Sequence, residues 1–181
     1  MTPGQIFAVV GPSGAGKDSL IAGAVALRPD LVWARRVITR PNDAGGEPFE
    51  GVGKAEFDTR KAAGEFVLDW QAHGLSYGIP ASIRVDLAAG RDVVFNGSRA
   101  ELPAALRQFS GLIVILVTAS PDSLAHRLAA RGREGMADIA QRLQRPDYAM
   151  PAGIVARTVV NDGTLAKGVT RFLAALQPVR A

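Results

Sequence analysis

Apolar and polar residues follow two different patterns along this chain, and segments with one pattern alternate with segments with the other. Short runs dominated by apolar residues are typical of buried strands in a parallel sheet. They occupy residues 6–10, 31–38, 93–95, 112–117 and 158–160. Apolar positions that recur every three or four residues predict helices packed on such a sheet. These stretches cover residues 18–27, 55–63, 80–90, 98–109, 120–130, 137–145 and 165–176.

Proline, glycine and small polar residues predict where some of these elements begin and end. Residues 41–53, which are rich in glycine and proline, are expected to form a loop. Two further short strands, 65–69 and 75–77, are expected around a turn at His73-Gly74. Pro80 is expected to open its helix, as prolines often do. Ser98 and Glu101 have the spacing of a capping box at the start of the next helix.

The alternation of strands and helices predicts one α/β domain over residues 1–181, with a parallel sheet core flanked by helices. Connections between neighbouring parallel strands are expected to be right-handed crossovers. In sheets of this kind ligands bind beyond the carboxyl ends of the strands. The loops that follow the strands are therefore where functional side chains are expected.

Composition narrows the classes of protein that fit. The chain has 181 residues, of which 48% are hydrophobic, and it has no cysteine. Disulfides, thiol catalysis and cysteine-bound zinc are excluded, and no uncharged run approaches the roughly 20 residues of a membrane span. The start of the chain does not resemble a signal peptide, so a cytoplasmic protein is expected. The net charge of +4 rests largely on arginine, which favours small polyanionic substrates.

The segment directly after the first strand carries the most specific chemical signal. It reads Gly11-Pro12-Ser13-Gly14-Ala15-Gly16-Lys17. A strand, a glycine-rich loop ending in lysine and a helix start form, in that order, a P-loop. Its main-chain N–H groups can point inward at phosphate oxygens, beside the positive end of the helix. We predict that residues 11–18 bind ATP and that Lys17 bridges its β- and γ-phosphates as a catalytic charge.

Asp18 departs from the usual pattern, in which Ser or Thr after the lysine offers a hydroxyl to magnesium. The strand at 93–95 carries no aspartate, although P-loop enzymes commonly present one there, and Asn96 is the first polar residue after it. Magnesium takes one or two carboxylates and keeps several waters. We therefore predict that Asp18 binds Mg²⁺ in place of a strand aspartate. The alternative is that its charge only stabilises the helix N-terminus.

Segments over nearly the whole chain resemble the guanylate-kinase-like P-loop kinases. Similar motifs are Ile38-Thr39-Arg40-Pro41, Gly46-Glu47, Tyr77-Gly78, Arg127-Leu128, Arg131-Gly132, Arg142-Leu143 and Val160-Asn161-Asp162. Within this group the chain most resembles the ribose 1,5-bisphosphate phosphokinases of phosphonate degradation. The residues that carry this closer resemblance are 16–20, Trp70, 74–78, 96–99 and 161–163.

The resemblance implies an acceptor-binding region at about residues 39–80 and a lid at about 131–146. It implies that Arg131 and Arg142 close over ATP with the lid and act in catalysis, and that Asn161 lies on the adenine side. The residues expected to bind the acceptor are Arg36, Thr39, Arg40, Tyr77 and Asn96.

The implied reaction transfers the γ-phosphoryl group of ATP to ribose 1,5-bisphosphate, which gives 5-phospho-α-D-ribose 1-diphosphate (PRPP) and ADP, with Mg²⁺ as the metal. A phosphate acceptor is already anionic near neutral pH, so no general base is needed. Catalysis then consists of positioning and charge neutralisation. PRPP biosynthesis during phosphonate catabolism is the implied context.

Two other functions stay open. One is a kinase of another acceptor such as GMP, and the other is a non-catalytic guanylate-kinase-like interaction domain. Guanylate kinases carry a glutamate that reads guanine a few residues before the Tyr-Gly pair. Leu68 stands at the corresponding place, with Asp69 beside it, which argues against GMP. We expect neither nucleic-acid nor membrane partners, and a homodimer is one option for the oligomeric state.

Overall fold

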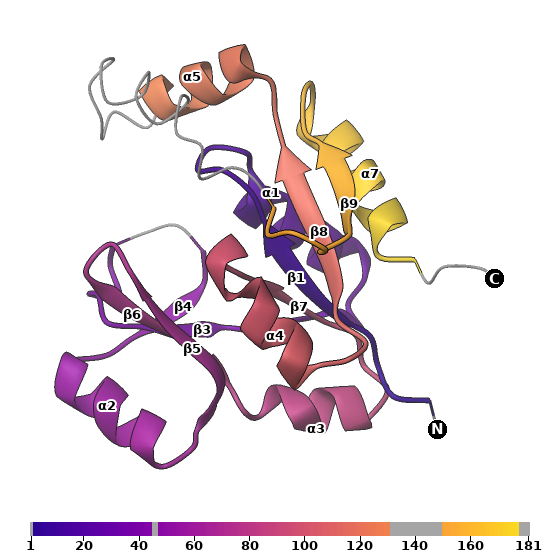
Figure 1. The fold of residues 1–181 in the computed structure, drawn as a ribbon. Coiled ribbons are helices and arrows are strands. Elements are labelled where there is room, and N and C mark those ends of the chain that lie inside the picture. The colour runs from indigo at the N-terminus through magenta and orange to yellow at the C-terminus, as the bar shows by residue number, and fades with distance from the viewer. Residues whose placement is uncertain (1, 45–46, 131–149, 178–181) are drawn as a thin grey trace.

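The structure is a computed structural model that describes residues 2–44, 47–130 and 150–177. Its centre is a five-stranded sheet in the order β2-β7-β1-β8-β9 (Figure 1). All four strand pairings in this sheet are parallel. The strands are β1 (Ile6–Val10), β2 (Val32–Trp33), β7 (Val93–Asn96), β8 (Ile113–Thr118) and β9 (Ala156–Val160).

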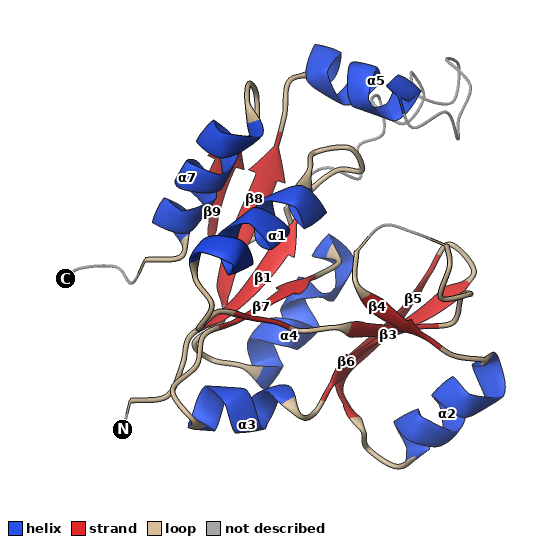
Figure 2. Ribbon diagram, turned by 180° about the vertical axis from the view of Figure 1, so that it is seen from behind, coloured by secondary structure: helices blue, strands red, loops and turns tan. Residues whose placement is uncertain are grey.

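Helices cover both faces of this sheet. On one face lie α1 (Lys17–Leu27) and α7 (Leu165–Ala175), and on the other lie α3 (Ile83–Ala88) and α4 (Leu102–Gln108) (Figure 2). The side chains of β1 alternate between the two cores: Phe7 and Val9 pack with α1 and α7, whereas Ala8 and Val10 pack with α3 and α4. Such two-sided burial explains why β1 is apolar throughout. Helix α5 (Pro121–Ala130) follows β8.

A second, smaller sheet lies beside the first, in the order β4-β3-β6-β5 (Figure 1). Its strands are β3 (Arg36–Ile38), β4 (Phe49–Gly51), β5 (Phe66–Ala72) and β6 (Leu75–Pro80), and helix α2 (Lys54–Ala62) connects β4 to β5. A tight turn joins β5 to β6, and His73 (φ 53°) and Gly74 (φ 74°) both adopt left-handed conformations in it. The predicted acceptor-binding region, residues 39–80, contains β4, α2, β5 and β6, whereas β3 precedes it.

Two strand predictions are corrected. The single strand expected at 31–38 is in fact two strands, because the chain leaves the first sheet after the bond from Ala34 N to Val94 O and enters the second at Arg36. The loop expected at 41–53 contains β4, which pairs with β3. Neither division shows in the local hydrophobic pattern, since it depends on which sheet each short segment joins.

Two helix starts also differ from prediction. Pro80 ends β6 opposite Phe66 instead of opening a helix, and Ala81 N continues the pairing with a bond to Glu65 O. A proline at the end of a strand removes no needed donor. Ser98 makes no capping hydrogen bond through its side chain, and a 3₁₀ turn (Arg99–Glu101) precedes α4, which has proline in its first turn. The helix expected at 137–145 lies outside the described residues.

Among the described residues, no helix combines the length and apolar character needed to cross a membrane.

Candidate nucleotide and acceptor site

The P-loop connects the carboxyl end of β1 to α1 in the conformation that the sequence predicts. Gly11, Gly14 and Gly16 all have positive φ angles, of 148°, 85° and 89°. At Gly11 a Cβ atom would lie 2.0 Å from the carbonyl oxygen of Val117, so only glycine fits there. The loop closes on itself through a 3.2 Å bond from Ala15 N to Pro12 O, while Ser13 is exposed.

The ammonium group of Lys17 folds back onto this loop. Its Nζ donates to Gly11 O at 2.9 Å and to Pro12 O at 3.1 Å. Exclusion of water lowers the pKa of Lys17 to about 8; the charge of Asp18 opposes this shift, and the charges of Arg36 and Arg99 add to it. The charge of Glu47 also opposes the shift, so two carboxylates and two guanidinium groups act on this lysine.

This lowered pKa predicts a pH dependence. Above pH 8 the ammonium group loses its proton and can no longer attract phosphate. We expect kcat/KM for ATP to fall about tenfold per pH unit above that value, because this ratio reports the free protein. Bound phosphates favour the charged ammonium, so kcat should fall only at higher pH. Initial-rate profiles test this, and a kcat/KM that stays flat to about pH 10 contradicts it.

Asn161 supports the P-loop from behind. Its side chain is 4% exposed, and Nδ2 donates to Ala15 O at 2.7 Å. A Cβ atom at Gly168 of α7 would lie 2.4 Å from Asn161 Oδ1, so this approach also requires glycine. Arg127 of α5 donates to Asn161 O at 2.7 Å and to Ala15 O at 3.4 Å. Asn161, which was predicted to bind ATP, thus forms a hydrogen bond to the loop that is predicted to hold the phosphates.

Asp18 belongs to a polar network that joins the P-loop helix to both sheets. Asn96 is 3% exposed at the end of β7, and its Nδ2 donates to Asp18 Oδ1 at 2.6 Å and to Glu47 Oε2 at 3.1 Å. Glu47 is also buried and forms an ion pair with Arg36, whose Nε donates to Oε2 at 3.0 Å. Arg36 further donates to Asn96 O at 3.3 Å. Asp18, which stands where Ser or Thr is usual, is therefore in direct contact with Asn96, the first polar residue after the strand that lacks an aspartate.

Arg36 also lies against an aromatic pair in the second sheet. Trp70 of β5 and Tyr77 of β6 are opposite each other in register, with parallel rings 5.4 Å apart. The Arg36 guanidinium carbon lies 5.0 Å from the centre of the Tyr77 ring and 5.7 Å from that of Trp70. Arg36, which was predicted to grip an acceptor phosphate, is thus held by a carboxylate and two rings.

The other two predicted acceptor residues, Thr39 and Arg40, line a groove of about 670 Å³ on the second sheet together with Lys54. The guanidinium of Arg40 lies 4.0 Å from the centre of the Phe49 ring. Thr39 Oγ1 accepts a 2.8 Å bond from Ser76 N, which ties β3 to β6. The predicted acceptor residues therefore form two groups, with Thr39 and Arg40 in the groove and Arg36, Tyr77 and Asn96 in the buried network.

Sequence reasoning assigned no role to Glu47 or Arg99, which the structure brings to the site. Arg99 lines a pocket of about 210 Å³ with Pro12 and Thr118, and its charge contributes to the lowered pKa of Lys17. Glu47 carried a weak signal, since it is part of a motif in the resemblance. The predicted lid and its arginines, Arg131 and Arg142, lie outside the described residues.

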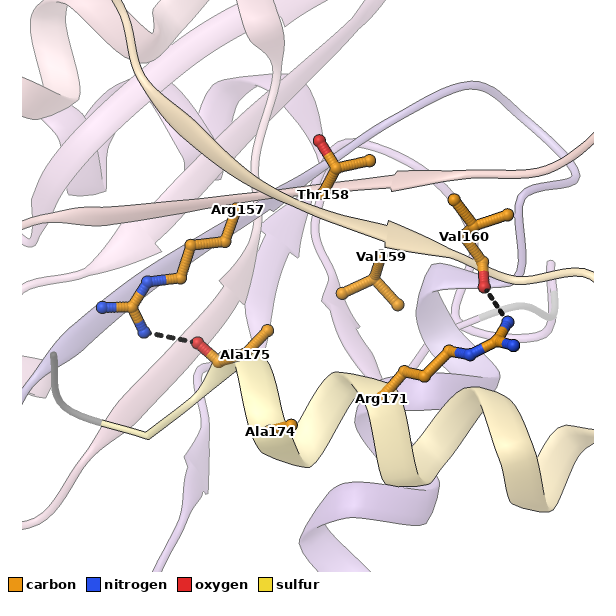
Figure 3. A pocket seen from close by; sticks show the side chains of 7 residues that line it. All are labelled: Arg157, Thr158, Val159, Val160, Arg171, Ala174 and Ala175. Atoms are coloured by element: carbon orange, nitrogen blue, oxygen red, sulfur yellow. Dashed lines mark hydrogen bonds between the residues drawn. The ribbon is translucent and has the colours of Figure 1, made fainter.

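A further groove of about 650 Å³ runs between β9 and α7 (Figure 3). Its two arginines are bound to main-chain carbonyls: Arg157 donates to Ala175 O at 2.6 Å and Arg171 to Val160 O at 2.8 Å. Both bonds are drawn in Figure 3. These arginines brace the edge strand against α7, and we assign the groove no part in the site.

Comparisons with known proteins give close relatives along the whole chain, although no family model matches it. Ribose 1,5-bisphosphate phosphokinase PhnN of Agrobacterium fabrum is 45% identical over 175 residues, which cover 95% of this chain and 96% of that protein. The protein of the same name from Ruegeria sp. is 45% identical over 179 residues, 98% of this chain and 94% of its own. A bifunctional ribose 1,5-bisphosphokinase-thymidine phosphorylase of Cupriavidus necator is 52% identical over 178 residues.

That match covers 96% of this chain but 29% of the bifunctional protein, so the chain spans less than a third of such relatives. Among solved structures, guanylate kinase from Anaplasma phagocytophilum aligns with a TM-score of 0.70 at 17% identity, over 97% of this chain and 85% of that one. A gluconokinase from Sinorhizobium meliloti aligns with a TM-score of 0.54 at 22% identity, over 97% and 92%. The predicted α/β fold of the P-loop kinases is confirmed.

Proposed function

The chain belongs to the ribose 1,5-bisphosphate phosphokinase family, and from that premise we propose that it transfers the γ-phosphoryl group of ATP to ribose 1,5-bisphosphate. The products are PRPP and ADP. The observation that carries this proposal is the match along the whole chain to single-activity relatives, combined with a P-loop onto which Lys17 folds back. In the cell this reaction would supply PRPP from a sugar bisphosphate, as in phosphonate catabolism.

The chemistry requires little more than placement of two polyanions. An oxygen of the acceptor 1-phosphate forms a bond to the γ-phosphorus, and the bond from that phosphorus to the β–γ bridging oxygen breaks. No proton has to move, because the acceptor is already anionic. The P-loop amides and Lys17 would hold the phosphates of ATP. Arg40 and the lid arginines Arg131 and Arg142 would supply positive charge around the transferred phosphoryl group, and the Tyr77 hydroxyl would donate a hydrogen bond to the acceptor.

The contact between Asp18 and Asn96 supports a magnesium role for Asp18. Asn96 Nδ2 donates to Asp18 Oδ1, which holds this carboxylate at the end of the strand beside β1. Carboxylate oxygens are among the ligands that Mg²⁺ prefers. Among the described residues no three His, Cys, Asp or Glu side chains gather in one place, so the protein would supply few ligands. When bound, the metal would neutralise charge on the β- and γ-phosphates.

Replacing Asp18 with asparagine tests this role. The change keeps the shape but removes the charge, so we expect the magnesium concentration for half-maximal rate to rise by about tenfold or more. Binding of Mn²⁺ to the ATP complex, followed by electron paramagnetic resonance, gives a readout that needs no turnover. Asp58→Asn, on the exposed surface of α2, is the matched control. An unchanged metal requirement assigns Asp18 to helix stabilisation instead.

The identity of the acceptor distinguishes the proposed reaction from the two alternatives, a kinase of GMP and an interaction domain. Asp69, which could have read a guanine base, is paired with Lys61 of α2, and Leu68 packs against the core. We expect ADP release and PRPP formation with ribose 1,5-bisphosphate, and no transfer to GMP. Brisk phosphorylation of GMP would replace the proposal with a guanylate kinase. Failure with every acceptor, despite ATP binding, would favour an interaction domain.

A further inference from the structure

Building on the proposed function, we propose that Trp70 is a specificity-determining residue that, together with Arg36, keeps nucleobases out of the acceptor site. The two side chains would restrict that site to a phosphorylated sugar without a base. Trp70 lies at the junction of the two sheets, in a core cluster that contains residues of both.

Trp70 fills this junction. Its side chain is 7% exposed and packs with core residues of the first sheet, including Val10 and Phe95. One of its neighbours is the predicted acceptor residue Tyr77, whose ring it parallels with an interplanar angle of 7°. The aromatic face that a flat base would use for stacking is thus already occupied by an indole.

Arg36 contacts the ring pair of Trp70 and Tyr77 and helps to hold it in place. Its guanidinium lies over both rings, and its position is set by Glu47 and by the carbonyl of Asn96. The Asn96 side chain donates both to Glu47 and to Asp18. The aromatic pair is thus connected to the P-loop helix through the side chains of Arg36, Glu47 and Asn96. A base that entered here would have to displace an ion pair as well as a ring.

Three side chains that could recognise a base, those of Glu47, Asp69 and Thr39, already have partners within the protein. Base recognition needs unpaired donors and acceptors in a dry site. In this sheet, Glu47 is bound by Arg36 and Asn96, Asp69 is paired with Lys61, and the Thr39 hydroxyl accepts from Ser76 N. These three side chains are therefore not available to a purine. Among the described residues of the network, Asn96 Oδ1 is a buried acceptor without a hydrogen-bond partner, and it belongs to the residue that bonds to Asp18 and Glu47.

The indole of Trp70 is similar in size and shape to a purine base. Indole and purine are both fused six- and five-membered rings, so removal of the indole leaves a space of purine dimensions beside Tyr77. Aromatic stacking would then be available to a nucleotide whose phosphate takes the place of the sugar phosphate. Trp70→Ala should therefore admit purine nucleoside monophosphates that the unaltered protein rejects.

The experiment compares the unaltered protein with Trp70→Ala, Trp70→Phe and the matched control Trp33→Ala. Trp33 lies on β2 and packs against the core on the α1 side of the first sheet. The probe is GMP, with its dissociation constant measured by calorimetry in the presence of ADP, and its inhibition constant measured against ribose 1,5-bisphosphate. We expect Trp70→Ala to lower both constants at least about tenfold, Trp70→Phe to lower them less, and Trp33→Ala to leave them unchanged.

Two outcomes would overturn the inference. One is a folded Trp70→Ala variant with the same weak GMP affinity as the unaltered protein, and the other is an equal gain from Trp33→Ala. If Trp70→Ala does not fold, Trp70→Phe decides by the same constants. The proposed function fails separately, if the unaltered protein does not turn over ribose 1,5-bisphosphate, and the GMP affinities remain readable in that case.

Discussion

Replacing Lys17 with methionine is expected to lower kcat by roughly a thousandfold while the protein stays folded. Lys17 Nζ is bound to the carbonyls of Gly11 and Pro12, so it lies within the loop that is predicted to hold the phosphates. Methionine retains much of the apolar stem but offers no charge to the γ-phosphate in the transition state. Since water is partly excluded from the ammonium group, its removal should leave the melting temperature unchanged or slightly higher.

Single-turnover rates with saturating ATP and acceptor separate this loss of rate from weaker binding. Lys167→Met, on the exposed surface of α7, is the matched control and should retain full activity. A Lys17→Met variant that keeps kcat within about tenfold would contradict a catalytic role for the lysine.

Replacing Glu47 with glutamine is expected to lower the free energy of unfolding by about 3–5 kcal/mol. The side chains of Arg36 and Glu47 are only 14% and 5% exposed, so loss of the carboxylate leaves a guanidinium charge largely out of water. For a domain of this size, such a loss lowers the melting temperature by roughly 10 °C. The same change should raise the KM for the acceptor, because Glu47 holds Arg36 against Tyr77.

The exposed pair Lys61–Asp69 provides the comparison within the same sheet. Its side chains are 55% and 29% exposed, and such pairs contribute at most about 1 kcal/mol. Asp69→Asn should therefore shift the melting curve far less than Glu47→Gln. A double-mutant cycle with Arg36→Gln measures the coupling directly, and near-additive effects would show that the buried pair is not a unit.

Local patterns were sufficient for the P-loop and for most of the first sheet. Residues 11–17 carry glycines where the backbone needs positive φ angles and a lysine at the helix start, and the bonds from this lysine to Gly11 O and Pro12 O form within a few residues of sequence. The strand β1 is apolar at every position because both of its faces are buried. Information of this kind is local, so periodicity and spacing report it correctly.

The family resemblance added a prediction of the reaction and of the acceptor-binding region, although it gave Glu47 no role. The periodic pattern alone could not divide residues 31–38 between two sheets or place Pro80 at the end of a strand. In both cases the decisive partner lies elsewhere in the chain: Val94 for Ala34, and Phe66 for Pro80. Short segments adopt the sheet that offers them hydrogen bonds, whatever their own propensity.

By itself, therefore, the sequence determined the glycine-rich loop after β1 and the α/β class, and through its family resemblance it indicated the reaction that we propose. Only the tertiary structure decided how the site is held together. Asn96 reaches Asp18 across 78 residues, Asn161 reaches Ala15 across 146, and Arg36 is held by Glu47 and stacked on Tyr77. The first two contacts exist because the carboxyl ends of the parallel strands lie along one edge of the first sheet. The contacts of Arg36 depend on the pairing within the second sheet. Both follow from strand order, which no local pattern records.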